Sequence, residues 1–334
     1  MDMTIIDDVY GLFRRSRGER DAALERDKQR AFVDQLSHLV HPVYKCRGWA
    51  TEQGIDVISD AAHVTRSLYG YQVLNAQHLG IVDVDFVLQE APEFVDETPK
   101  DFLTVEAQTK LVTERIEYWA ASKHWSNKLT DEAWRAYRTA AGMRLIRTDA
   151  VQPLDETFDY VCDYVDADPL YRDIAKEQLC FRARLTAKPI RVGLQYPRWD
   201  AYDEGGDGWS HIDRAILPMY DAAADALAGR YKTCELIAEV GSGVVAPELE
   251  PLIQYHDDAC KVCSSLPLEP AHASEFSPSD EYLQTVRDFA AKYRTNGGCA
   301  EYEAGPATPD LIWALLTDKA KDAIKDLDAN ENKN

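Results

Sequence analysis

Two aspartates separated by a single residue lie within an apolar segment of the chain. Asp83 and Asp85 belong to the sequence GIVDVDF, residues 80–86. On an extended strand alternate side chains point to the same face, so both carboxylates would share one face. Two carboxylates at that spacing repel each other unless a cation lies between them, and Mg²⁺ and Mn²⁺ prefer oxygen ligands. Because the apolar flanks indicate a central strand, where unpaired carboxylates are costly, the motif predicts a divalent-metal site; the alternative is two solvated aspartates at a strand end.

A local reversal of charge follows further along the chain. Residues 176–198 hold six cations and one acid, within a chain whose formal net charge is −21. In the segment FRARL, Arg182 and Arg184 would share one face of a strand, and Lys188 follows shortly after. A guanidinium presents a planar fork of donors that suits phosphate oxygens, whereas the alternative is pairing with the abundant acids. A metal-binding acid pair and a phosphate-binding strand in one core support each other, because phosphoryl transfer uses both.

Between these two segments lies a turn rich in small residues, TAAGMR, from Thr139 to Arg144. A glycine such as Gly142 lets backbone N–H groups approach a phosphate, while a basic side chain on the next strand neutralises the charge. An ordinary hairpin would have the same composition. The position of the turn between the acid pair and the basic strand favours a phosphate-binding role.

A fourth group of residues has the spacing of zinc ligands. His256, Cys260 and Cys263 form an H-x₃-C-x₂-C run, and Cys299 or His272 would supply a fourth ligand. The helical pattern around the two cysteines and the lack of a second C-x₂-C argue against zinc.

The composition excludes several classes of protein. The chain has 334 residues, with 37 Lys and Arg against 58 Asp and Glu, which excludes a general basic coat for nucleic acid and a polybasic membrane anchor. With 45% hydrophobic residues, 7 Trp and 17 Tyr, the chain can form a buried core. No apolar run of about 18 residues and no secretory signal pattern occur, so an intracellular, cytoplasmic protein without membrane contact is expected. The odd number of cysteines does not suggest a disulfide framework.

The elements that must position these residues follow from periodicity and turn signals. Strands are expected between residues 43 and 86, one of them at 43–50, with one short helix at 59–70. Downstream the pattern predicts a helix at 104–122, strand-turn-strand at 134–149, helices at 158–168 and 168–178, a strand at 179–194, and helices at 215–243, 247–263, 279–298 and 309–328. Three regions result: an N-terminal helical arm (1–42), an α/β core (43–200) and a mainly helical C-terminal region (201–334).

The order of the motifs resembles the archaeo-eukaryotic primase superfamily, which includes the primase-polymerases. Those proteins carry an h-D-h-D/E strand, matched by Asp83 and Asp85, and then a strand-turn-strand with a small hydroxyl residue, Gly and His. Thr139 and Gly142 match this second motif, but Arg144 stands where the family usually has His. A third acid and a basic strand follow in the family, and FRARLTAKP is similar to that strand. The resemblance covers about residues 70–195 and implies an α+β fold with an RRM-like, primase-type mixed sheet.

The resemblance also implies a mechanism, two-metal nucleotidyl transfer. Asp83, Asp85 and a third acid would hold two Mg²⁺ or Mn²⁺ ions; Asp168 is the choice for the third acid, with Asp163, Asp166 and Asp173 nearby. Nucleoside triphosphates and a DNA or RNA template would be the partners, and the helical C-terminal region would suit a partner protein. The residues implied for binding the triphosphate or the template backbone are Thr139, Gly142, Arg144, Arg182, Arg184 and Lys188.

Two other functions are compatible with the sequence. A degenerate primase-like core that binds nucleic acid or a partner without catalysis is favoured by Arg144 in place of His. A glycosyltransferase that holds the metal of a nucleotide sugar through D-x-D would explain Asp83 and Asp85 but leaves Arg182 and Arg184 without a role. It would also need a mononucleotide-binding β-α unit upstream of the acids, and no clear one occurs there.

Overall fold

The computed structural model describes residues 56–59, 61–67, 69–86, 104–121, 132–195, 211–295 and 316–331. These residues form helices and two antiparallel sheets, which confirms the predicted α+β class. The predicted N-terminal arm (1–42) and the strand predicted at 43–50 lie outside the described residues.

The strands form two four-stranded sheets, in the orders β1-β2-β3-β7 and β4-β6-β5-β8. All neighbouring strands in these two sheets are antiparallel, so the described strands do not form the mixed sheet that was expected. The acidic strand β4 and the basic strand β7 therefore belong to different sheets. The strand bounds are β1 Asp56–Ser59, β2 Ala62–Arg66, β3 Gln72–Ala76, β4 Ile81–Asp85, β5 Ala133–Thr139, β6 Gly142–Arg147, β7 Phe181–Arg184 and β8 Cys234–Gly241.

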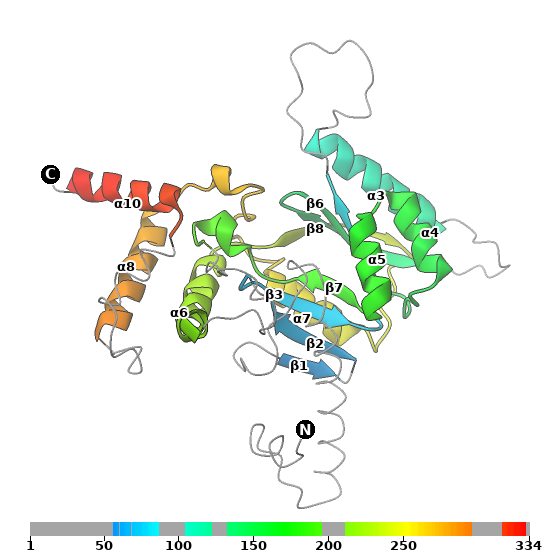
Figure 1. The fold of residues 1–334 in the computed structure, drawn as a ribbon. Coiled ribbons are helices and arrows are strands. Elements are labelled where there is room, and N and C mark those ends of the chain that lie inside the picture. Colours follow the sequence, from blue (N-terminus) through cyan, green and yellow to red (C-terminus); the bar gives the residue numbers. More distant parts are fainter. Residues whose placement is uncertain are drawn as a thin grey trace, which may run out of the picture.

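Most of the described helices gather in two places. Figure 1 shows α3, α4 and α5 together at one end of the sheets, and α6, α8 and α10 together at the opposite end. The helix bounds are α3 Val105–Ala121, α4 Glu156–Val165, α5 Pro169–Gln178, α6 His211–Ala228, α7 Glu250–Cys260, α8 Asp280–Thr295 and α10 Asp318–Glu331, with 3₁₀ helices η2 Pro189–Val192 and η3 Ala273–Glu275. None of the helices in the described part of the chain is long and apolar enough to cross a bilayer.

The start of α5 is fixed by its sequence. The side chain of Asp168 accepts a hydrogen bond from the backbone N–H of Leu170 at 3.0 Å, as an N-cap aspartate does. Pro169 occupies the first turn, where its missing N–H costs nothing. The predicted Asp-Pro start of this helix is confirmed, and it holds the Asp168 carboxylate at the helix end.

The short helix predicted at 59–70 is wrong, because Ala62–Arg66 forms β2. This strand pairs with β1 on one side and β3 on the other, and its five side chains are buried. Pairing on both edges satisfies its backbone groups, so tertiary contacts override the local pattern. Gly70, with φ +91°, then turns the chain, and a Cβ there would meet the Tyr220 ring at 2.6 Å.

Two further predictions differ from the structure. The strand expected at 179–194 is only four residues long, Phe181–Arg184, and a 3₁₀ helix begins at Pro189, which cannot donate a ladder hydrogen bond. The helix expected at 215–243 ends at Ala228, and Cys234–Gly241 forms β8, which pairs with β5.

The described residues form two hydrophobic cores. The larger includes residues of both sheets and of α3, α4, α5 and α7, whereas the smaller joins α6, α8 and α10 to the segment around Val192. The expected boundary near residue 200 therefore does not separate a core from a helical region, because β8 and α7 belong to the larger core. Arg66 links the two parts: its guanidinium binds Asp225 of α6 at 2.8 and 2.9 Å.

Candidate active site

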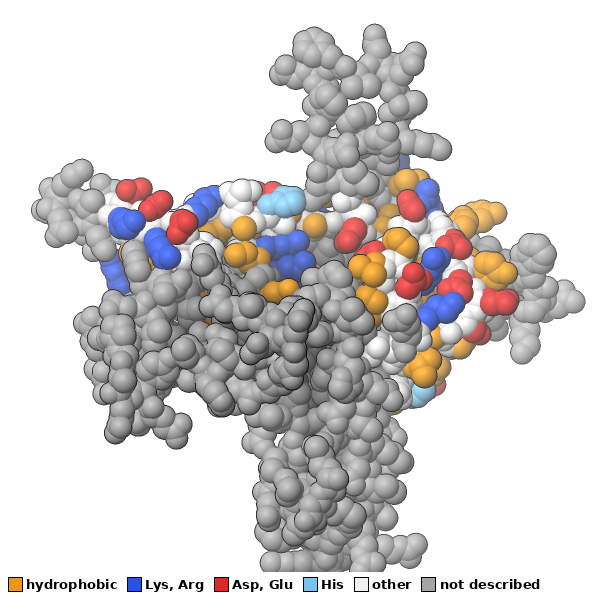
Figure 2. Space-filling model, viewed as in Figure 1, with side chains coloured by type: hydrophobic (Ala, Val, Ile, Leu, Met, Phe, Trp, Pro, Cys, Tyr) orange, Lys and Arg blue, Asp and Glu red, His pale blue; other side chains and the backbone are white. Residues whose placement is uncertain are grey.

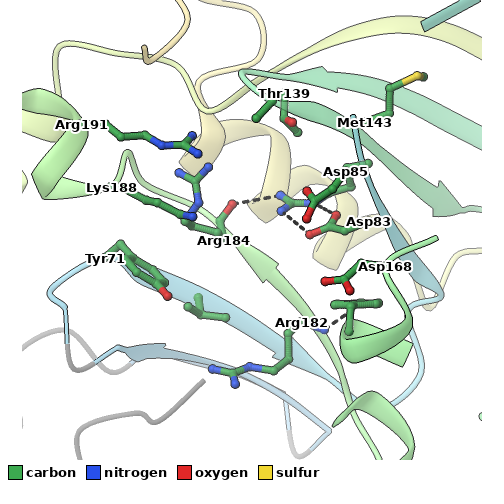
Figure 3. A pocket seen from close by; sticks show the side chains of 14 residues that line it. Tyr71, Asp83, Asp85, Thr139, Met143, Asp168, Arg182, Arg184, Lys188 and Arg191 are labelled. Carbon is green, nitrogen blue, oxygen red and sulfur yellow. Dashed lines mark hydrogen bonds and ion pairs between the residues drawn. The ribbon is translucent and has the colours of Figure 1, made fainter. Parts of the chain in front are cut away.

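A pocket of about 180 Å³ opens between the two sheets, and most of the predicted site residues line it. Figure 3 shows the labelled carboxylates on one side and a group of basic side chains on the other. Figure 2 shows basic side chains beside an acidic one in the middle of this face of the molecule. The lining residues named below are Tyr71, Asp83, Asp85, Thr139, Arg144, Asp168, Tyr171, Arg182, Arg184, Lys188 and Arg191.

The acidic wall is organised by the register of β4 and β6. Asp83 lies directly opposite Arg144, and Asp85 lies opposite Gly142. Opposed side chains on antiparallel strands share a face, so the two motifs meet. Arg144 binds Asp83 with two parallel hydrogen bonds, Nε to Oδ1 at 2.8 Å and Nη2 to Oδ2 at 3.2 Å. The Arg144 side chain is 3% exposed and that of Asp83 is 30% exposed. Asp83 is therefore partly accessible from the pocket, while the buried guanidinium neutralises its charge.

Gly142 has a packing role at this point. A Cβ on residue 142 would lie 2.0 Å from the carbonyl oxygen of Val84, a contact that no side chain tolerates. The residue does not line the pocket, unlike its neighbour Thr139. The glycine thus allows β6 to approach β4 beside Asp85, and the phosphate-binding role predicted for it remains a prediction.

Asp168 is brought to the acidic wall by its backbone. Its N–H donates to the carbonyl oxygen of Asp83 at 3.2 Å, which fixes the N-terminus of α5 against β4. The three alternative third acids do not line the pocket. Asp163 and Asp173 pair with Arg172 at 2.6 and 3.6 Å, and Asp166 ends α4 in a left-handed conformation.

The surroundings of Asp85 disfavour the charged form of its carboxylate. Burial raises its pKa above the ordinary value, and the negative charges of Asp83 and Asp168 raise it further. Lys188 and Arg191 act in the opposite direction but do not reverse the shift. A cation placed among the three carboxylates would remove this repulsion.

The basic wall is held by a buried carboxylate, Glu269, whose side chain is 0% exposed. It accepts hydrogen bonds from Arg184, from Arg191 at 3.0 Å and from the backbone N–H of Lys188 at 2.9 Å. Within the described residues the Lys188 ammonium makes no hydrogen bond or ion pair, and Lys188 lines the pocket. Burial, with the charges of Arg184 and Arg191, lowers the pKa of Lys188 to about 8.

Arg182 and Arg184 both line the pocket, as strand alternation predicts, but they are anchored differently. The Nε of Arg182 donates to Oδ1 of Asn75 in β3 at 3.0 Å, and this arginine is 6% exposed. Arg184 turns instead toward Glu269.

One tyrosine joins the two sheets at the pocket. The hydroxyl of Tyr171, in α5, donates to the carbonyl oxygen of Ile81 at 2.9 Å and accepts from the N–H of Arg182 at 3.3 Å. Ile81 belongs to β4 and Arg182 to β7, so a single hydroxyl spans the gap between the acidic and the basic sheet.

Sequence reasoning missed four residues of this site: Tyr71, Tyr171, Arg191 and Glu269. Arg191 belongs to the basic segment and would have been found by including every cation of that segment. The other three carry no local signal, because contacts across the fold bring them to the pocket.

The predicted zinc ligands are only partly grouped. Cys234, His256 and Cys260 lie together, all buried, with ligand atoms within 4.8 Å of one another. Cys263 is exposed and outside this group, because α7 ends at Cys260 and Lys261 turns the chain in a left-handed conformation. His272 is exposed, and Cys299 lies outside the described residues.

The comparisons with known proteins add no relative. Neither the protein-family models, nor the curated proteins, nor the solved structures contain a match to this chain.

Proposed function

We propose that the pocket is the site of a metal-dependent nucleotidyltransferase of the primase-polymerase type. The observation that supports this most strongly is the pairing of two walls in one pocket: three aspartates on one side, and Arg184, Lys188 and Arg191 on the other. Nucleotidyl transfer needs oxygen ligands for divalent ions and cations for phosphate oxygens within one site.

The acidic wall fits Mg²⁺ or Mn²⁺ by the chemistry of its donors. Asp83, Asp85 and Asp168 offer only carboxylate oxygens, the ligands that these ions prefer. Burial raises the pKa of Asp85, the charges of Asp83 and Asp168 raise it further, and a divalent ion would relieve the repulsion among these charges. When bound, such ions lower the pKa of an attacking hydroxyl and neutralise a leaving pyrophosphate.

The chain's own residues would bind and orient the nucleotide. The guanidinium groups of Arg184 and Arg191 are held by Glu269, so little side-chain entropy is left to lose when they donate to phosphate oxygens. Lys188 adds a cation that phosphate would keep protonated. The pocket volume, about 180 Å³, is below the roughly 300–1,000 Å³ of pockets that enclose whole ligands, so the triphosphate enters while base, sugar and template lie outside.

A second candidate, a nucleotide-binding protein without catalysis, is favoured by one specific contact. Arg144 occupies both oxygens of Asp83 and supplies an internal positive charge, which competes with a metal for this carboxylate. The glycosyltransferase alternative has less support, since β1, β2 and β3, the described strands upstream of the acids, pair antiparallel and form no β-α unit.

Primer extension and primer-independent synthesis with Mn²⁺ or Mg²⁺ test the proposal. Asp83→Ala would leave the buried Arg144 unpaired and endanger the fold, so Asp85→Asn is the better variant. We expect the wild type to incorporate nucleotides and Asp85→Asn to lose at least about a hundredfold in rate, while the control Asp173→Asn, on the exposed side of α5, keeps its activity.

Three outcomes separate the candidates. Full activity of purified Asp85→Asn would refute the metal mechanism. A wild type that binds nucleoside triphosphates but incorporates none supports the non-catalytic candidate. Metal-dependent hydrolysis of a nucleotide sugar, without incorporation, supports the glycosyltransferase. Binding to DNA or RNA should be weak and should weaken further with salt, since a narrow basic wall in an acidic chain contacts few phosphates.

A further inference from the structure

The contacts of Arg144 continue beyond Asp83 into the interior. Its Nη1 donates to the carbonyl oxygen of Arg184 at 2.9 Å and lies 3.3 Å from Nε2 of His256. The imidazole is 0% exposed, and its Nδ1 lies 2.9 Å from Oδ1 of Asp257. A row of polar groups therefore runs from α7 through β6 to the acidic wall on β4.

The protonation of this row follows from one chemical fact. A guanidinium has only donors, so Nε2 of His256 must accept from Arg144 and carry no proton. The proton of the neutral ring then lies on Nδ1, where the Asp257 carboxylate accepts it. The other oxygen of Asp257 accepts from Arg135 at 3.1 Å, which holds this carboxylate in place. The Tyr137 ring packs edge-on against the imidazole, with centroids 5.0 Å apart, and limits its rotation.

We infer that His256 is a positioning residue, which fixes the guanidinium of Arg144 and through it the carboxylate of Asp83. The inference rests on the proposed function, because a fixed Asp83 matters only if that carboxylate binds a metal. Asp83 itself is half-open to the pocket, so a firm orientation must come from its partner. Without His256, one N–H of Arg144 would point at an apolar or sulfur-lined space, and a buried charged donor without an acceptor is costly.

Binding of zinc by the Cys234, His256 and Cys260 group is the competing role for this histidine. Both ring nitrogens already have partners, Arg144 on Nε2 and Asp257 on Nδ1. A metal at this position would also lie beside a buried guanidinium, whose positive charge repels it. The contacts thus favour the positioning role.

The first experiment measures the tautomer of His256 by ¹⁵N NMR on the full chain. Burial lowers the pKa of His256, but hydrogen bonds to Asp257 and Cys234 raise it above the ordinary value. Above that pKa we expect the spectrum of a neutral ring with Nδ1 protonated and Nε2 unprotonated. A protonated Nε2 would overturn the inference. This readout does not depend on activity, so it decides the inference even if the proposed function fails.

The second experiment measures Mn²⁺ affinity by electron paramagnetic resonance of the free ion. A glutamine can place an amide oxygen near the position of Nε2, whereas a leucine cannot accept a hydrogen bond. We expect His256→Leu to raise the Kd for Mn²⁺ about tenfold, and His256→Gln to stay within about threefold of the wild type. His272→Gln, on an exposed histidine, is the matched control and should bind as the wild type does.

Equal Kd values for the leucine and glutamine variants would overturn the inference, since a purely structural role predicts no rescue. If His256→Leu does not fold, Asp257→Ala replaces it, with exposed Asp258→Ala as its control. Asp257→Ala removes the acceptor of the Nδ1 proton and should raise the Kd for Mn²⁺, so an unchanged Kd in this variant overturns the inference. Stoichiometric zinc in the purified wild type that is lost in Cys234→Ser but kept in Cys263→Ser would overturn it as well. A wild type that shows the expected tautomer and Mn²⁺ binding but no incorporation refutes the proposed function alone.

Discussion

Glu269 is the buried counter-ion of the basic wall, and Glu269→Gln removes its charge with little change in shape. In the wild type one carboxylate faces two guanidinium groups and one backbone N–H. Both guanidinium groups donate to Oε1 and the Lys188 N–H donates to Oε2, so the single amide oxygen of glutamine can face the arginines or the N–H, but not both. At least one hydrogen bond is lost, those that remain have a neutral acceptor, and two arginines stay close together without their counter-ion.

The expected cost follows from burial. Hydrogen bonds to charged groups contribute about 1.5–3 kcal/mol each, and breaking a buried pair costs about 3–5 kcal/mol. Arg184 and Arg191 are each 15% exposed, so some water reaches them and the lower end applies, about 3 kcal/mol. For a chain of 334 residues that corresponds to a fall in melting temperature of about 4 °C.

Thermal melting at pH 7, followed by circular dichroism and repeated in urea, measures this loss. Glu248→Gln is the matched control, because Glu248 is exposed in the turn before α7, and it should change the free energy of unfolding by less than about 0.5 kcal/mol. If Glu269→Gln melts within about 1 °C of the wild type, Glu269 does not organise the basic wall, and the assignment of Arg184 and Arg191 to a preformed phosphate site fails with it.

Three further predictions address the pocket. The pKa of Lys188 is lowered to about 8, so its ammonium loses its charge as pH rises through 8. The affinity of the wild type for pyrophosphate, measured by calorimetry, should therefore fall by up to about tenfold between pH 7 and 9, compared with that of the control Lys188→Arg. The pKa of Asp85 is raised, so above that pKa its negative charge destabilises the fold. Without metal, Asp85→Asn should melt at a higher temperature than the wild type at pH 7 and should lose this advantage at low pH. Mn²⁺ at 100 times its Kd should stabilise the wild type by roughly 2.7 kcal/mol but should not stabilise Asp85→Asn. Gly142→Ala should lose about 3 kcal/mol or more in urea melts, since its Cβ would meet the Val84 carbonyl at 2.0 Å, whereas Gly243→Ala, in open space at φ +69°, should lose only about 1 kcal/mol.

Local rules predicted the parts of the site that lie within one element. Alternation along a strand placed Asp83 and Asp85 on one face, and the Asp-Pro pair placed Asp168 at the start of a helix. Both arguments need only residues that are close together in the chain, and all three side chains line the pocket.

Contacts between elements could not be predicted from the sequence. The pairing of Asp83 with Arg144 depends on a strand register that the sequence does not specify, and Glu269 reaches the basic wall from a loop more than 75 residues away from Arg191. The helix predicted over Ala62–Arg66 was wrong for the same reason: the segment pairs with a strand on each side and forms a central strand, although its local pattern is helical.

The hydroxyl of Tyr171 has a consequence for solubility. β4 and β7 are edge strands of their sheets, and unpaired edges invite strand addition by other molecules. On β4, the carbonyls of Ile81 and Asp83 accept from Tyr171 and from the N–H of Asp168. On β7, the N–H of Arg182 and the carbonyl of Arg184 bind Tyr171 and Arg144. The groups that shape the pocket thus also close two sheet edges against aggregation.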